Sequence, residues 1–276
     1  MDISANIGYF FQRGYYEGLT ANLYPIEDKK AAQKTYFDRQ NKVLKDSSKV
    51  NVSDSEQIPC EGFCEIPLTT IYPGLITGIG MIHATGMQGE TKLGMAFDYT
   101  SGLPYIPGSS VKGMLRSMFK DSQYIKEIYH NIQNEIWKTH PKEEFPEFGD
   151  SEFCELEDLI FEGKKKDKSF LPIYERDVFF DAKIKGDYTE KGILDFDYIT
   201  PHPNPLKDPE PNMFLKILPN VTFVFAFKLI DSELSSKKIF KAYYKKAIFE
   251  AILTTVGIGA KTNVGYGQLK TVNDKD

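Results

Sequence analysis

An alternation of apolar and polar residues predicts several β-strands in this chain. The clearest lies in KILPNVTFVFAFKLI (residues 216–230), where Val221, Phe223, Phe225 and Phe227 alternate on one face. IPLTTIYPGLITGIG (residues 66–80) is rich in β-branched residues and glycine, which predicts a strand followed by an irregular turn. Two further strands are predicted at residues 178–184 (VFFDAKI) and 193–199 (ILDFDYI).

Two other stretches have the spacing of amphipathic helices. In the first, Ser109 is the expected N-cap, and apolar residues recur on one face at Val111, Met114, Leu115, Met118 and Phe119. Its other face carries cations at four-residue spacing, which predicts an exposed basic stripe: Lys112, Arg116 and Lys120. The second helix is expected to begin at Ser235 or Ser236 and to end at Gly257, with most of its lysines on the solvent side.

Three segments between these elements are predicted to be surface loops or insertions. Residues 27–57 are polar and predict a charged helix or loop, and residues 143–170 combine an acidic half with KKKDK and predict a solvated insertion. The stretch ITPHPNPLKDPEPN holds five prolines and predicts an extended loop. We find no repeat of fixed period, and we expect residues 1–276 to form a single domain.

Composition and charge narrow the class of protein. An apolar fraction of 41% with 13% aromatic residues is enough for a substantial core. The net charge is -5, so binding to nucleic acid would depend on the local placement of cations. The start of the chain lacks the pattern of a signal peptide, and no window reaches the roughly 18 apolar residues of a membrane span. We therefore expect a cytoplasmic protein with no membrane partner.

The cysteines and histidines give no sign of a metal or a disulfide framework. The cysteine count is odd, and Cys60 and Cys64 have a C-x3-C spacing without a second ligand pair, so free thiols are expected. The histidines (His83, His130, His140 and His202) lack a metal-ligand spacing, and only His83 and His202 lie beside loops where an acid or base would be useful. We expect no metal and no cofactor.

A glycine-rich loop at residues 257–267 (GIGAKTNVGYG) is the main candidate site. Gly257, Gly259, Gly265 and Gly267 would let the backbone approach a ligand and expose its amides. The residues between them offer a charge, hydrogen bonds and a stacking ring: Lys261, Thr262, Asn263 and Tyr266. The loop does not fit the spacing of a Walker loop or of a dinucleotide fingerprint. The remaining alternatives are a phosphodiester-binding loop and a purely structural turn.

A second candidate anion site lies at the start of the first helix, in PGSSVKG. Ser109 and Ser110 supply hydroxyls, the helix N-terminus supplies amides, and Lys112 and Arg116 supply charge. The alternative is that Ser109 caps the helix and Lys112 is merely solvated. We call the glycine-rich loop and the start of the first helix the two corners. The hypothesis is that they lie side by side and hold a ribose-phosphate strand, with an affinity that falls as the salt concentration rises.

The motifs occur in the order typical of a known family. IPGSSVKGMLRS, VFFDA and GIGAKTNVGYG make residues 66–269 resemble the RAMP superfamily of CRISPR-associated proteins. Within that superfamily, NIGYFFQRGYYEGL, FDYITPH and ILPNVTFVFAF most resemble the family of sixth subunits of the type III-B Cmr effector complex. The resemblance implies an α+β fold with a ferredoxin-like (RRM-like) β-α-β-β-α-β core and long insertions.

The same resemblance implies a function. It points to a non-catalytic subunit of the effector ribonucleoprotein that holds the guide RNA (crRNA) near its 3′ end during antiviral RNA targeting. The implied partners are the guide RNA, the target RNA by proximity, and other Cmr effector subunits of the RAMP superfamily, one of which cleaves the target. Two alternatives stay open: a metal-independent endoribonuclease that processes precursor guide RNA with His83 or His202, and a purely architectural subunit.

Overall fold

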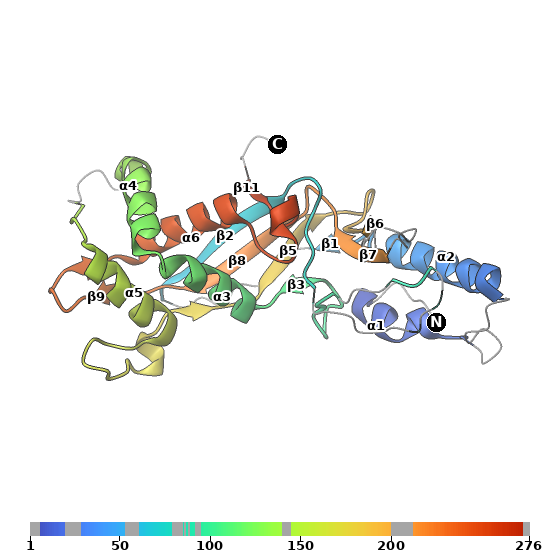
Figure 1. The fold of residues 1–276 in the computed structure, drawn as a ribbon, viewed down its shortest axis with the longest axis horizontal. Coiled ribbons are helices and arrows are strands. Elements are labelled where there is room, and N and C mark those ends of the chain that lie inside the picture. Colours follow the sequence, from blue (N-terminus) through green and yellow to red (C-terminus); the bar gives the residue numbers. More distant parts are fainter. Residues whose placement is uncertain are drawn as a thin grey trace, which may run out of the picture.

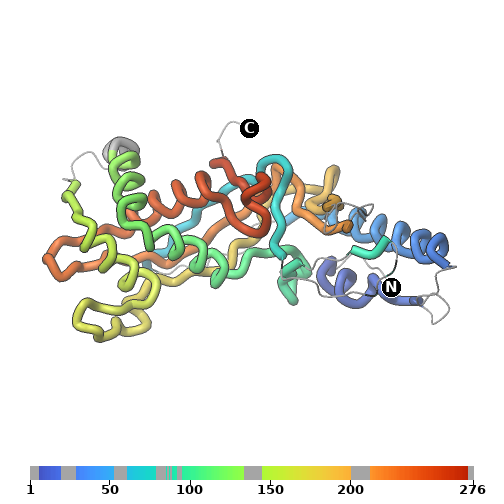
Figure 2. Tube along the Cα trace, in the orientation of Figure 1, coloured from blue at the N-terminus to red at the C-terminus, as the bar shows by residue number. Residues whose placement is uncertain are grey.

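The computed structural model describes residues 6–19, 29–52, 61–78, 95–139, 145–199 and 212–272, together with residues 85, 87 and 89–91; for residues 134–139 it describes the backbone alone. The fold is α+β, and the molecule is elongated (Figures 1 and 2). A central sheet with two long helices separates an end formed by α4 and α5 from an end formed by α1 and α2 (Figure 1).

The central sheet is antiparallel. Its order is β1-β5-β8-β2-β11, with β3 paired to β5 and β4 paired to β8. Strand β8 is paired along its length with β2, with Ile66 opposite Phe225, and this contact is the most extensive in the sheet. The strands are β1 (Asn51–Val52), β2 (Phe63–Thr70), β3 (Tyr105–Ile106), β4 (Val178–Phe179), β5 (Ala182–Asp187), β8 (Thr222–Lys228) and β11 (Leu269–Thr271).

One face of this sheet forms the core. Phe223, Phe225 and Phe227 are fully buried, as their alternation predicts. They face α3 (Gly108–Phe119) and α6 (Ala242–Val256), which lie on the same face of the sheet (Figure 1). Phe249 of α6 joins these elements, since its ring lies 5.4 Å from that of Phe227 and 6.1 Å from that of Phe119.

The start of α6 differs from the prediction. Residues 232–240 form a short hairpin of β9 (Ser232–Glu233) and β10 (Ile239–Phe240), so Ser235 and Ser236 do not cap the helix. The helix begins at Ala242, whose amide donates to Asp231 Oδ1 at 2.8 Å. A carboxylate eleven residues upstream therefore takes the role expected of a serine, because it suits the positive end of the helix dipole.

Lys245 of α6 also departs from the prediction that the lysines of this helix face solvent. Its side chain is fully buried, and its ammonium donates to Asp177 Oδ2 at 2.5 Å and to the carbonyl of Ile230 at 2.6 Å. Asp177 in turn accepts from the amide of Ile230 at 2.9 Å. Both charges of this buried ion pair are thus hydrogen-bonded, which is what keeps such a pair tolerable in a core.

Residues 150–162 form a helix, α5 (Asp150–Glu162), and not a solvated loop. Phe153, Leu156 and Ile160 lie on one face and are buried, so the acidic residues of EFCELEDLIFEG occupy the other face of an amphipathic helix. The helix packs against α4 (Ser122–Thr139). Within the described residues, none of the helices has both the length and the apolar content needed to cross a bilayer.

The other end of the molecule is organised around a buried polar network. The aromatic N-terminus forms α1 (Ile7–Gln12) and η2 (Gly14–Tyr16), and the polar stretch that follows forms α2 (Lys30–Ser47). The hydroxyl of Tyr15 donates to Asn41 of α2 at 2.7 Å. Burial raises the pKa of Tyr15 to about 12, so the phenol stays protonated and keeps this hydrogen bond. Next to α2 lie β6 (Leu194–Ile199) and β7 (Asn212–Ile217).

Candidate nucleic-acid interface

The glycines of the 257–267 loop are required by close backbone contacts. Gly259 and Gly267 have φ angles of 100° and 73°, in the left-handed region. A Cβ atom at residue 259 would lie 2.5 Å from the carbonyl oxygen of Ile76, and one at residue 267 would overlap the carbonyl of Ile258. The loop therefore packs backbone against backbone, and glycine is the residue that allows it.

The predicted exposure of the loop amides fails at the two ends of the loop, because the amides there already have acceptors. The amide of Ile258 donates to Gly267 O at 2.9 Å, that of Ala260 to Ile76 O at 2.9 Å, and that of Gly267 to Gly74 O at 2.8 Å. These hydrogen bonds fix the loop onto the segment that follows β2. The glycines thus shape the ends of the loop, whereas the consecutive amides of Lys261, Thr262 and Asn263 have no acceptor among the described residues.

The outward part of the loop is its middle, from Lys261 to Asn263. Lys261 has a φ of 63° and is exposed, and it precedes the short helix η6 (Thr262–Val264). Asn263 is exposed as well. In the part of the chain that the structure describes, no carboxylate lies within ion-pairing distance of the Lys261 ammonium. This cation is therefore available to a ligand from outside.

Tyr266 does not present the stacking surface that was predicted for it. Its hydroxyl donates to Asp197 Oδ2 of β6 at 2.7 Å, and its ring lies 5.9 Å from that of Phe214 of β7. Lys216 also binds Asp197, at 2.7 Å. Burial disfavours the charged form of Asp197, but the hydrogen bonds from Lys216 and Tyr266 outweigh it and lower the pKa of this carboxyl. Tyr266 thus anchors the loop to β6 and β7.

An exposed aromatic ring that the sequence pattern did not predict lies beside the loop. Tyr72 lies in the turn after β2 and is 83% exposed. The turn adjoins the glycine loop, since a Cβ atom at Gly265 would lie 3.6 Å from Pro73 Cδ. The sequence signal was present, because a tyrosine before a proline in a glycine-bearing turn has little apolar surface to pack against. Tyr72 is the stacking ring that this site offers.

The start of α3 is less suited to anions than predicted. The helix begins at Gly108 with Pro107 at the N-cap, so Ser109 lies in the first turn and is not the cap. The amide of Gly108 donates to Asp181 Oδ1 at 2.7 Å, and the amides of Ser110 and Val111 donate to the carbonyl of Pro107. A carboxylate of the protein therefore already occupies the helix N-terminus.

The hydroxyls and the lysine of this corner do face outward. Ser109 and Ser110 are exposed. Lys112 is half-buried, with its ammonium 5.9 Å from the centre of the Phe179 ring, and no described carboxylate forms an ion pair with it. The prediction for this corner therefore holds for its side chains and fails for its amides.

Arg116 is not part of a free basic stripe. Its Nε donates to Glu157 at 2.7 Å and its Nη2 donates to Glu162 at 2.5 Å, both on α5. These two hydrogen bonds raise the pKa of the guanidinium further and keep it charged. Because two carboxylates already neutralise the guanidinium, Arg116 is not available to a phosphate. The structure therefore does not support the prediction that Arg116 binds RNA.

The two predicted corners lie at the same end of the α3–α6 pair (Figure 1). A chain of backbone hydrogen bonds connects them through the segments at residues 74–78 and 95–97. Ala260 donates to Ile76, Ala96 donates to Thr77, and Tyr105, just before α3, donates to Ala96. The corners are therefore joined by a shared framework of backbone hydrogen bonds that runs through these two segments.

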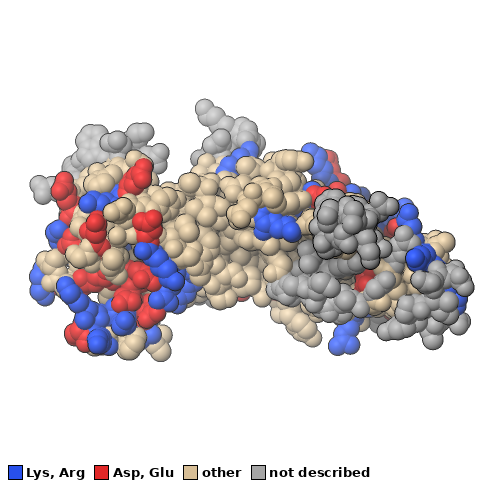
Figure 3. Space-filling view, viewed as in Figure 1, with Lys and Arg blue, Asp and Glu red and all other residues tan. Residues whose placement is uncertain are grey.

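Charge is unevenly spread over the molecule. In the view of Figure 3, acidic and basic side chains gather at the end formed by α4 and α5, while the middle of this face is mostly uncharged. The cations available near the loop are Lys261 and Lys112, supplemented by the exposed Lys270 of β11. An interface here would thus rely on few charges.

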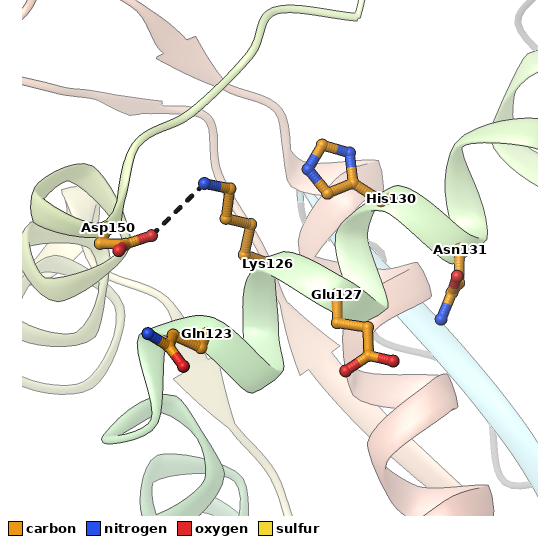
Figure 4. A pocket seen from close by; sticks show the side chains of 6 residues that line it. All are labelled: Gln123, Lys126, Glu127, His130, Asn131 and Asp150. Atoms are coloured by element: carbon orange, nitrogen blue, oxygen red, sulfur yellow. Dashed lines mark hydrogen bonds and ion pairs between the residues drawn. The ribbon is translucent and has the colours of Figure 1, made fainter.

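Other candidate sites are weaker. A hollow of about 380 Å³ lies along α4 and is lined by Gln123, Lys126, Glu127, His130, Asn131 and Asp150 (Figure 4). Its charges are mixed, with Lys126 directed toward Asp150 at 3.5 Å, and it lies at the α4–α5 end, away from the glycine loop (Figures 1 and 4). His83, His140 and His202 lie outside the described residues.

The thiols give no metal site in the described part of the chain. Cys64 and Cys154 are free, and Cys60 lies outside the described residues. Burial raises the pKa of Cys64 to about 11, so this thiol is not a poised nucleophile. Among the described residues, no group of three or more histidine, cysteine, aspartate and glutamate side chains is arranged to hold a metal ion.

Sequence comparison identifies the family. The profile of the RAMP superfamily matches residues 67–270. This range includes both candidate corners, the whole of β3, β4, β5 and β8, and parts of β2 and β11. The chain belongs to the RAMP superfamily, as its motifs predicted.

Within the superfamily the chain is similar to Cmr6 subunits. It is 30% identical over 223 residues to the CRISPR system Cmr subunit Cmr6 of Pyrococcus furiosus, covering 65% of this chain and 61% of that protein. It is 26% identical over 271 residues to the CRISPR system CMR subunit Cmr6 of Saccharolobus solfataricus, covering 93% of this chain and 69% of that protein. The chain therefore spans less than two thirds of the Pyrococcus relative.

Two solved structures with some similarity to this chain also come from Cmr systems. One is a cryo-EM structure of the type III-B Cmr-beta complex bound to cognate target RNA, with 22% identity, 96% of this chain and 72% of that chain covered, and a TM-score of 0.45. The other is the crystal structure of Cmr6 from Pyrococcus furiosus, with 21% identity, 76% and 98% covered, and a TM-score of 0.41.

The backbone contacts of the loop make a test of its architecture. We predict that Gly267→Ala lowers the free energy of unfolding by about 1–3 kcal/mol, because alanine is strained at a positive φ and its Cβ would displace the Ile258 carbonyl. Denaturant unfolding followed by circular dichroism measures it. The matched control is Gly113→Ala in α3, where no atom lies within 4 Å of the new Cβ, and a gain of about 0.5–1 kcal/mol is expected. Equal stability of Gly267→Ala and wild type would contradict the contact.

Proposed function

We propose that the chain is a non-catalytic subunit of a type III-B CRISPR effector ribonucleoprotein and that it holds the guide RNA near its 3′ end. The observation that carries the proposal is the outward part of the glycine loop, where Lys261 and Asn263 stand exposed on a rigid backbone beside the ring of Tyr72. A cation, an amide and a ring in one place are the chemistry that binds a single-stranded polynucleotide.

The proposed fold of the RNA-holding core is ferredoxin-like. Support comes from the order of elements β2, α3, β5, β8, α6 and β11, and from the sheet order β5-β8-β2-β11 with every pair antiparallel. This is the order of a β-α-β-β-α-β unit whose two helices cover one face. In this description, α4, α5 and the region of α1 and α2 are additions to the core.

Each part of the site has a distinct task in this proposal. Lys261 and Lys112 neutralise phosphates, and Asn263, Ser109 and Ser110 donate hydrogen bonds to phosphate or ribose oxygens. Tyr72 stacks on a base, which adds affinity without sequence preference. The glycines Gly257, Gly259, Gly265 and Gly267, together with Thr262 and Tyr266, hold the loop in shape.

The proposed partners follow from the relatives. Both curated relatives are named as subunits of a Cmr system. We infer that this chain likewise assembles, in the cytoplasm, with other Cmr subunits of its superfamily, and that target RNA lies close by. A subunit whose task is to hold RNA needs no catalytic group of its own.

The ionic part of the proposal has a quantitative test. We predict that Lys112→Gln combined with Lys261→Gln weakens binding to single-stranded guide RNA and lowers the slope of log affinity against log salt by about 1.4, since each phosphate contact on a single strand contributes about 0.7. Fluorescence anisotropy at several salt concentrations measures both quantities. Lys237→Gln, on the β9–β10 turn at the far end of the molecule, is the matched control. An unchanged slope in a folded double variant would remove these lysines from the interface.

Tyr72 allows a separate test of stacking. We predict that Tyr72→Ala weakens RNA binding by roughly 1–3 kcal/mol and leaves the salt slope unchanged, because a stacked ring carries no charge. Tyr72→Phe keeps the ring and is expected to bind like wild type. Tyr99, which is 94% exposed, provides the control Tyr99→Ala. Equal loss in the phenylalanine and alanine variants would point to the hydroxyl and argue against stacking.

The absence of catalysis is also testable. We predict that purified protein incubated with repeat-containing precursor RNA in the presence of a chelator leaves the RNA intact, as judged on a denaturing gel. Specific cleavage within the repeat would instead support the endoribonuclease alternative. Loss of that cleavage in His83→Ala or His202→Ala would then identify the base.

A further inference from the structure

A second surface, far from the glycine loop, has the features of an interface. After α5 the chain forms a hairpin that projects from the body of the molecule below that helix (Figure 1). The amide of Leu171 donates to Gly163 O at 2.7 Å, and that of Lys165 donates to Ser169 O at 2.8 Å. The amide of Lys168 donates to Lys165 O at 2.9 Å and closes a turn at the tip.

Large apolar side chains stand exposed beside this hairpin. Phe170, Ile173 and Tyr174 are 60%, 80% and 72% exposed, within five residues of one another. Their backbone is held in place, since Arg176 donates to Leu171 O at 2.7 Å and Lys228 donates to Tyr174 O at 2.7 Å. A fixed cluster of exposed apolar residues is costly for a monomer and marks a contact site.

The tip of the hairpin carries charge that the protein does not neutralise. Lys165 and Lys168 are exposed, and no described carboxylate lies within 4 Å of either ammonium. The one acid of the tip, Asp167, is occupied with the amide and hydroxyl of Ser169. Lys166 is exposed as well, and its ammonium donates a hydrogen bond to the uncharged Ser235 hydroxyl at 3.4 Å, so three cations border the apolar cluster.

We propose that these five residues, the hairpin surface (Lys165, Lys168, Phe170, Ile173 and Tyr174), dock a partner protein that presents an apolar patch bordered by carboxylates. Aromatic and arginine-rich centres with a charged rim are the ordinary anatomy of protein interfaces, and Arg176 lies 5.8 Å from the centre of the Phe170 ring. The inference rests on the proposed function in one respect, namely that the partner is another subunit of the same complex.

The surroundings favour a protein over RNA as the occupant. Ile173 is the most exposed of the three apolar side chains, and an aliphatic group cannot stack on a base. Glu175 follows Ile173 and Tyr174 directly and is exposed, so its charge would oppose a polyanion, whereas Asp158 and Glu162 are paired with Lys164 and Arg116.

A second copy of this chain is a poor occupant, because its own acidic helix is already satisfied. Every acidic residue of α5 has a partner within the molecule. The pairs are Asp150 with Lys126, Glu152 with Lys238, Glu155 with Ser235, Glu157 and Glu162 with Arg116, and Asp158 with Lys164. The acidic helix of a second copy therefore offers no free carboxylate to the hairpin lysines.

The test uses the effector complex purified without this subunit, to which wild type and variants are added. We expect Lys165→Glu with Lys168→Glu, and separately Ile173→Ser with Tyr174→Ser, to bind the complex at least about tenfold more weakly than wild type. Both variants are expected to bind single-stranded RNA alone like wild type. Lys42→Glu with Tyr99→Ser removes an exposed lysine of α2 and an exposed tyrosine away from the hairpin, and this variant is expected to bind the complex normally.

The outcomes separate the two proposals. If wild type itself does not join the complex, the proposed function fails. If wild type joins and the hairpin variants join equally well, the hairpin surface is not the docking site. If the variants lose RNA affinity instead, the surface contacts RNA and the inference is overturned. Hydroxyl-radical footprinting of the wild type gives an independent reading: Phe170 and Tyr174 should be protected by the protein complex and not by RNA alone.

Discussion

The candidate interface depends on the direct contact of two stretches of backbone, the glycine loop and the segment after β2. Gly259 and Gly267 bring the loop against Ile76 and against its own start at Ile258, at distances that leave no room for a Cβ atom. Three amide-to-carbonyl hydrogen bonds then hold it there. Because the ends of the loop are fixed in this way, its middle must turn outward, and Lys261 and Asn263 are presented on a rigid support. Rigidity of this kind lowers the entropic cost of ordering a binding residue.

Internal ion pairs decide which cations remain available. Without α5, helix α3 would carry an exposed row of cations, as its sequence spacing suggests: Lys112, Arg116 and Lys120. The acidic face of α5 packs beside it and neutralises Arg116 with Glu157 and Glu162. The insertion therefore reduces the positive potential of α3 while it stabilises the contact between the two helices. The number of charges left for RNA is small, and the proposed interface must rely on hydrogen bonds and stacking in addition to charge.

The sequence predicted the parts of this molecule that depend on periodicity, and failed where distant segments meet. The strand at residues 221–227, the helix from Val111 to Phe119 and the end of α6 at Gly257 follow from local patterns, and the structure has them. The acceptor at the start of α6 is Asp231, the acceptor at the start of α3 is Asp181, and the partner of Lys245 is Asp177. Each of these comes from another element, so no local pattern specifies it. The same reason applies to Tyr266, which was predicted to stack, because its partner Asp197 belongs to β6.

The elongated shape separates the two proposed surfaces, and this separation has a consequence for assembly. The glycine loop lies in the middle of the molecule, and the hairpin surface lies at the α4–α5 end (Figure 1). A subunit that grips RNA with few charges binds weakly by itself, but a second contact to a neighbouring protein raises the effective concentration of the RNA site. Two modest interfaces on one rigid body can then give stable incorporation, and neither needs a strongly basic surface. This accounts for a net charge of -5 in a chain for which an RNA-holding role is proposed.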